Sequence, residues 1–73
     1  MGFSYNKLWK LLIDKNMNKS DLQFAINTTP KTIAKMGRGE NVSLETLGKI
    51  CEYFHCDIGD IIEYKKEVSL NDR

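Results

Sequence analysis

Apolar residues recur at intervals of three or four along most of this chain, a period that is typical of amphipathic helices. The first such stretch covers residues 5–15, where Leu8, Leu11 and Leu12 share one face. Asn16 lies at its end. The pattern therefore predicts an N-terminal helix of about three turns.

A second, shorter helix is predicted to begin after Asn18, which is a good N-cap residue. Asp21 lies three positions later, where a carboxylate can bond back to the cap as in a capping box. The apolar stripe of this helix is Leu22, Ala25 and Ile26. Asn27 follows where the chain must turn, and asparagine tolerates the positive φ of a helix stop better than most residues.

A third helix is predicted to begin at Pro30. Thr29 is an accepted N-cap, and proline suits the first helical position because its missing N–H would be unpaired there in any case. The inward positions and the two glycine stops of this helix are Ile33, Met36, Gly37 and Gly39.

Two further helices complete the pattern. Ser43 caps the fourth, whose apolar positions are Leu44, Leu47, Ile50, Cys51 and Phe54. Asp57 caps a short fifth helix that carries Ile58, Ile61 and Ile62, and Gly59 weakens it. The aromatic residues at core spacing are Trp9, Phe24, Tyr53 and Phe54. Because no strand pattern is visible, the sequence predicts an all-α fold, a compact five-helix bundle.

The length of 73 residues allows one domain, which we expect over residues 3–64, followed by a polar and frayed tail over 65–73. So small a domain has little room for a substrate cavity, and no nucleophile is paired with a base, so an enzyme is not expected. No apolar run is long enough to span a membrane, and no secretory signal is visible. A cytoplasmic protein is therefore expected.

The candidate metal ligands Cys51, His55 and Cys56 fall one short of the four that a structural zinc site requires. Two cysteines are also too few for a disulfide-stapled scaffold. We therefore expect no metal, no cofactor and no small-molecule ligand.

The charges are separated along the chain, although the formal net charge is only +1. Five cations stand against one carboxylate in residues 15–38, a local charge of +4, whereas residues 39–64 carry a local charge of −5. A basic segment of this kind suits phosphate binding. Two solvated faces of opposite sign would explain the same distribution equally well.

Residues 18–39 form the most informative stretch. A capped helix of two turns is followed by a short turn, and then by a second capped short helix that ends at glycine. Two helices so short and so closely joined must cross steeply, which is the helix-turn-helix geometry. In that arrangement the first helix braces the second, and the second offers its N-terminal residues to the major groove of DNA.

The same stretch resembles the Cro and repressor type of helix-turn-helix family. The resemblance rests on NKSDL at 18–22, NTTPKTIAK at 27–35, Gly39, SLETL at 43–47 and IC at 50–51. The ending CDIGDIIEY at 56–64 is similar to a small bacterial, single-domain branch of that family. The resemblance implies a lambda-repressor-like bundle of five helices whose second and third helices form the helix-turn-helix.

The family's base-reading positions fall here on Pro30, Lys31 and Lys35, with Thr32 beside them. Lysine can donate to guanine O6 and N7, but it can equally contact a phosphate, so both roles stay open for Lys31 and Lys35. Pro30 has no donor and is limited to apolar contact. The resemblance also implies phosphate contacts by Lys19, Thr28, Thr29, Arg38 and Ser43. Capping explains Thr29 and Ser43, and plain surface charge explains Lys19 and Arg38, without any DNA.

The function expected from these features is that of a sequence-specific transcriptional regulator that binds double-stranded DNA through residues 30–36. We expect a homodimer, because two half-sites would roughly double the readout. The alternative is a protein-interaction or antitoxin-like module that keeps the helix-turn-helix fold and binds DNA weakly or not at all. The modest net charge and Pro30 favour that alternative slightly.

Overall fold

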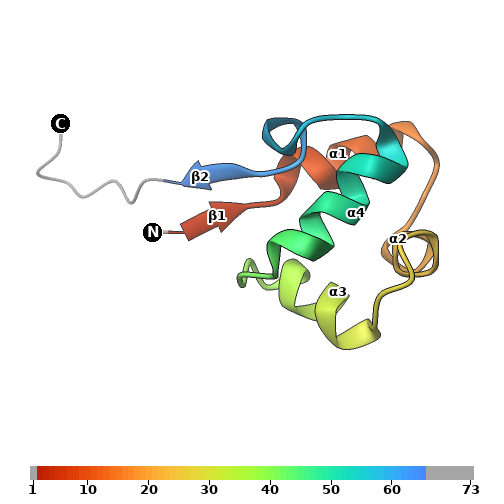
Figure 1. The fold of residues 1–73 in the computed structure, drawn as a ribbon, viewed down its shortest axis with the longest axis horizontal. Coiled ribbons are helices and arrows are strands. Elements are labelled where there is room, and N and C mark those ends of the chain that lie inside the picture. The colour runs from red at the N-terminus through yellow and green to blue at the C-terminus, as the bar shows by residue number, and fades with distance from the viewer. Residues whose placement is uncertain (1, 66–73) are drawn as a thin grey trace, which may run out of the picture.

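The computed structural model describes residues 2–65 and contains four α-helices, one turn of 3₁₀ helix and a small sheet (Figure 1). The helices are α1 (Asn6–Asp14), α2 (Lys19–Ala25), α3 (Pro30–Gly37) and α4 (Leu44–Phe54). The 3₁₀ turn is Ile58–Asp60, and the strands are β1 (Gly2–Ser4) and β2 (Glu63–Lys65). Of the tail expected over 65–73, Lys65 belongs to β2 and residues 66–73 lie outside the described part.

The predicted fifth helix is wrong: residues 57–62 form only the single 3₁₀ turn. Asp57 does cap it, because its backbone N–H donates to Asp60 Oδ2 at 2.9 Å and its own Oδ1 accepts from the Ile58 N–H at 2.8 Å. Starting a helix is costly, and a segment this short with Gly59 inside it gains too little from propagation. Ile61, fully buried, anchors the chain to the core instead.

The expectation of no strands is also wrong. β1 and β2 pair antiparallel, with Gly2 opposite Lys65, Phe3 opposite Tyr64 and Ser4 opposite Glu63. The rings of Phe3 and Tyr64 meet edge to face, with their centroids 5.4 Å apart. Three residues are too few to display a period of two, and the partner strand lies about sixty positions away, so local pattern could not reveal the pairing.

A single apolar core lies between the helices and is closed by Ile61. Its buried residues are Tyr5, Leu8, Leu12, Leu22, Ile26, Ile33, Met36, Leu47, Ile50 and Ile61. Trp9 and Phe54 pack against this core half-buried, as do Cys51 and Cys56.

Four predicted apolar core positions are wrong. Phe24 is 77% exposed, Leu44 is 75% exposed, Tyr53 is 48% exposed and Ile58 is 40% exposed. Phe24 lies two positions after the buried Leu22, and two helical steps of about 100° place it on the opposite side of α2. Leu44 is the first residue of α4 and precedes the buried stripe of that helix.

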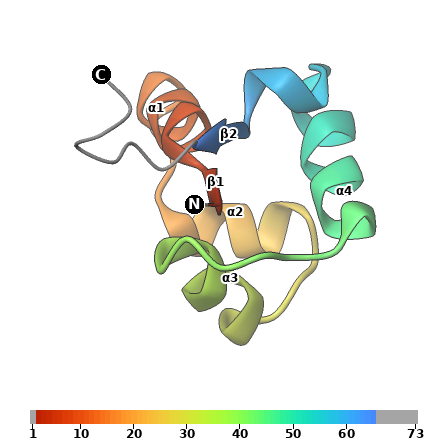
Figure 2. The same ribbon diagram turned by 90° about the vertical axis from the view of Figure 1, so that its left-hand side faces the viewer.

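Within residues 2–65, no helix is long and apolar enough to cross a membrane. The helices that carry the predicted DNA-binding residues, α2 and α3, pack directly against each other. Figure 1 looks nearly along α2 while α3 lies across the view, and Figure 2 shows the pair from the side. The steep crossing that the short turn predicts is therefore present.

Candidate nucleic-acid interface

The turn between α2 and α3 is closed by backbone hydrogen bonds. The Thr28 N–H donates to the Gln23 carbonyl at 3.0 Å, and the Asn27 N–H donates to the Phe24 carbonyl at 3.3 Å. This is the pattern of a Schellman stop, which requires a left-handed residue at its centre. Asn27 supplies it with φ of 55°, as the sequence predicts, and so takes the place that glycine often fills.

Both helices of the pair begin at side-chain caps. Asn18 and Asp21 form the predicted capping box, in which the Asp21 N–H donates to Asn18 Oδ1 at 2.7 Å and the Asn18 N–H donates to Asp21 Oδ2 at 2.9 Å. Thr29 caps α3 by accepting from the Thr32 N–H at 3.2 Å, and Pro30 occupies the first turn. These local bonds fix where α3 begins and which of its residues point outward.

The outward face of α3 carries a row of cations. Ile33 and Met36 are buried, whereas Pro30 and Lys31 are exposed and Thr32 and Lys35 are half-buried. Lys31, Lys35 and Arg38 follow one another at intervals of four and three, so they lie on one side of the helix and of its C-cap. We call these three residues the basic stripe.

Arg38, at the end of the basic stripe, is held by a neighbour that sequence reasoning missed. Its Nε lies 2.7 Å from Glu40 Oε2, and both side chains are about half exposed. The hydrogen bond from Arg38 lowers the pKa of the Glu40 carboxyl, so the pair is charged near neutral pH. A phosphate must therefore compete with Glu40 for this guanidinium. The two residues are separated by only one position, so the pairing was readable from the sequence.

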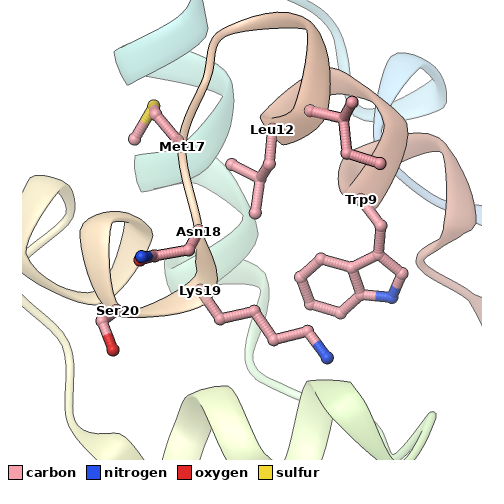
Figure 3. A pocket seen from close by; sticks show the side chains of 7 residues that line it. Trp9, Leu12, Met17, Asn18, Lys19 and Ser20 are labelled. Atoms are coloured by element: carbon pink, nitrogen blue, oxygen red, sulfur yellow. The ribbon is translucent and has the colours of Figure 1, made fainter.

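The Lys19 ammonium, which belongs to α2, lies near the C-terminal end of α3, whereas Thr28 and Thr29 precede its N-terminal end. The Lys19 Nζ is 4.6 Å from the centroid of the Trp9 ring (Figure 3). A Cβ at Gly37 would lie 3.5 Å from the same nitrogen. The first residue of α2 thus meets a ring from α1 and the last residue of α3. Sequence reasoning assigned Trp9 to the core alone and missed this contact.

Ser43 caps α4, where its Oγ accepts from the Thr46 N–H at 3.1 Å. The structure confirms the predicted cap. The Ser43 side chain is exposed and follows the connection that leaves α3.

The residues considered as metal ligands are placed near the end of α4. The Cys56 N–H donates to the Cys51 carbonyl at 3.0 Å, and both thiols are free. Across residues 2–65, no three His, Cys, Asp or Glu side chains are grouped as a metal site would need.

Comparison with known proteins identifies the family. The model of the Cro/C1-type helix-turn-helix DNA-binding domain matches residues 7–67, which is most of the chain. The chain belongs to the Cro/C1-type helix-turn-helix family. The predicted resemblance to the Cro and repressor type of helix-turn-helix family is therefore confirmed.

A solved structure supports this assignment. The crystal structure of the transcriptional regulator VanUg is 56% identical to this Cro/C1-type chain, with a TM-score of 0.86. The match covers 90% of this chain and 88% of the other. No curated protein matches the chain significantly.

Membership of the Cro/C1-type family places the basic stripe within a DNA-binding domain. The matched region includes both helices of the pair and all nine residues expected to contact DNA. The geometry divides those residues into three groups. Thr28, Thr29, Pro30, Lys31 and Thr32 lie at the start of α3. Lys35, Arg38 and Lys19 lie toward its end, and Ser43 begins α4.

Proposed function

We propose that this Cro/C1-type protein is a transcriptional regulator that recognises a specific duplex sequence with α3 in the major groove. The observation that carries the proposal is the capped start of α3 beside the outward basic stripe, on a helix that packs against α2 and buries Ile33 and Met36 in the core. The role is one of binding, with no catalytic step. None of the comparisons points to the alternative of an interaction module without DNA.

Lys31 is the strongest candidate for base reading. It is exposed and lies in the first turn of α3, the part of a recognition helix that reaches deepest into the groove. Lys35 and Arg38 lie further along the same side, toward the C-terminal end of the helix and away from that first turn. We therefore assign Lys31 to base edges and the other two cations to phosphates.

We further propose that the protein acts as a homodimer on DNA. Each chain offers few base-reading donors, because Pro30 has none and Thr32 is half-buried. Two half-sites separated by about 34 Å, one turn of the duplex, would double the number of base contacts. The readout of a single chain is too sparse to select one operator in a genome.

Selection of bound duplexes from a random library tests both statements. We expect enrichment of a motif with two related half-sites centred about 10 base pairs apart. A single half-site would contradict the dimer only, and no enriched motif would contradict sequence-specific regulation. Lys10→Ala is the matched control for Lys31→Ala in this selection, since Lys10 is an exposed lysine on α1. Only Lys31→Ala should broaden the motif.

A further inference from the structure

The contact between Lys19 and Trp9 joins the three helices that form the DNA-binding half of the molecule. Lys19 Nζ lies 4.6 Å from the centre of the indole ring and beside Gly37, the last residue of α3. Figure 3 shows the lysine side chain extended from the start of α2 toward the Trp9 ring. No ion pair between Lys19 and a carboxylate is present within residues 2–65.

The indole is itself held in place. Trp9 is half-buried and packs against the core, and its ring lies against that of Tyr5, with the centroids 6.3 Å apart. Tyr5 is almost fully buried and its hydroxyl donates to the Glu40 carbonyl at 2.8 Å. The ring is therefore a fixed surface on which a flexible side chain can rest.

An ammonium over an indole face is attracted by the ring's quadrupole. A free lysine side chain has many rotamers, and ordering it on binding costs free energy. A lysine that already rests on Trp9 has lost part of that freedom before DNA arrives. Because an ammonium has three N–H donors, the side turned away from the ring stays able to bond a phosphate oxygen.

The position of the ammonium also matters. It lies at the end of α3 toward which the basic stripe runs, next to the residue that precedes Arg38. Gly37 has no side chain to fill this space. Lys19 can therefore extend the basic stripe although it belongs to another helix.

We propose that Trp9 is a positioning residue for DNA binding, whose indole holds the Lys19 ammonium at the end of α3 so that it neutralises a backbone phosphate. This inference rests on the proposed function, because it assumes that the α3 surface meets duplex DNA. It gives Trp9 a role beyond packing.

A double-mutant cycle tests the inference, with a fluorescently labelled duplex of about 25 base pairs titrated by anisotropy from about 50 to 200 mM NaCl. The variants are Trp9→Leu, Lys19→Met and the double variant. We expect Lys19→Met to weaken binding and to reduce the log–log salt slope by about 0.9, the value for one phosphate. Trp9→Leu should weaken binding about two- to fivefold, which is the size of an exposed cation–π contact.

The decisive result is the combination. In the Lys19→Met background, Trp9→Leu should cause no further loss, because the side chain that it positions is already gone. Equal losses by Trp9→Leu in both backgrounds would overturn the proposal and make Trp9 a packing residue only. An unchanged salt slope in Lys19→Met would overturn it as well. If the wild-type protein binds no duplex at about 50 mM salt, the proposed function fails first and this proposal with it.

Two further variants serve as controls for effects on folding and on total charge. Trp9→Phe keeps an aromatic face, so its affinity for the duplex should be closer to that of the wild type than the affinity of Trp9→Leu is. Lys49→Met removes an exposed lysine on α4, outside the basic segment, and is the matched control for Lys19→Met. Trp9 is the single tryptophan of the chain, so its emission reports the contact directly. Lys19→Met should change that emission in the free protein, and Lys49→Met should not.

Discussion

At the scale of single residues, the cations of the basic stripe differ in how free they are to meet DNA. Lys31 is exposed, Lys35 is half-buried, and Arg38 already bonds Glu40. Charge counts treat these residues as equal, but their surroundings separate them. In the proposed function, Lys31 reads base edges. Arg38 must give up its bond to Glu40 before it can bond a phosphate.

Replacing Lys31 by alanine should reduce the affinity for the selected operator by about 1–3 kcal/mol, the value of a base contact. The loss of affinity should be much smaller on random duplex, because binding there depends on the phosphate contacts, which the substitution leaves in place. Competition titrations of the two duplexes measure the difference. An equal loss on both would reassign Lys31 to a phosphate.

Glu40→Gln should strengthen binding to random duplex. The change removes the partner that holds Arg38 and also a negative charge that repels the DNA backbone. Since exposed ion pairs contribute little, we expect only a small gain in affinity, of at most about fivefold. Glu45→Gln, on the exposed first turn of α4, is a comparison for charge alone. Equal gains in the two variants would show that Arg38 is not restrained by Glu40.

At the scale of elements, α3 depends on its cap. Thr29→Ala removes the oxygen that accepts from the Thr32 N–H, and such losses cost about 0.5–2 kcal/mol of stability. Urea unfolding of the free protein measures the cost. Thr28→Ala is the matched control, because Thr28 takes part in the turn through its backbone N–H. A cost as large for Thr28→Ala would mean that the cap is not the source of the stability.

The helices and their caps could be predicted from the sequence because their signals are local. Asn18, Asn27, Thr29 and Ser43 act within four residues of themselves, and each does what its residue type predicts. The two-stranded sheet could not be predicted, because it depends on Phe3 meeting Tyr64 across the whole chain.

The candidate site likewise has one part that could be predicted from the sequence and one part that could not. The basic stripe follows from the spacing of Lys31, Lys35 and Arg38 on one predicted helix. The contact of Lys19 with Trp9 depends on how α1, α2 and α3 pack together, and no local pattern encodes that packing.

At the scale of the whole molecule, Tyr5 ties the start of α1 to the connection between α3 and α4, through its hydrogen bond to the Glu40 carbonyl. Burial raises the pKa of the Tyr5 hydroxyl above its ordinary value of 10.0. The folded state therefore favours the protonated phenol. This contribution to stability is complete below about pH 10 and is lost as the pH rises toward the folded-state pKa.

The free energy of unfolding should accordingly decrease as the pH rises above about 10, and urea titrations at several pH values measure it. Tyr5→Phe should be less stable at pH 8, because the Glu40 carbonyl loses its partner, but its stability should depend less on pH above 10. Burial also raises the pKa of the Cys56 thiol, which adds a decrease of the same sign to both proteins. Curves of equal slope would show that Tyr5 does not contribute.

Part of the acidic charge lies apart from the basic stripe, although Glu40 bonds Arg38 within it. The basic stripe runs along α3 to its C-cap, whereas Glu52 lies in α4 and Asp57 and Asp60 lie at the 3₁₀ turn. Figure 1 shows α3 and that turn on opposite sides of the molecule. In the proposed complex, this charge distribution would orient α3 toward the phosphates.

The central claim is that the α3 surface binds duplex DNA, and the salt dependence of the affinity tests it most directly. Three phosphate-neutralising cations, Lys19, Lys35 and Arg38, would give a log–log slope of about −2.7 per protomer. The affinity for duplex DNA should then fall about 40-fold between about 50 and 200 mM NaCl. Measurable binding at the lower salt with this steep decrease is the predicted result, and no binding at about 50 mM NaCl, or binding that does not change with salt, would contradict the account.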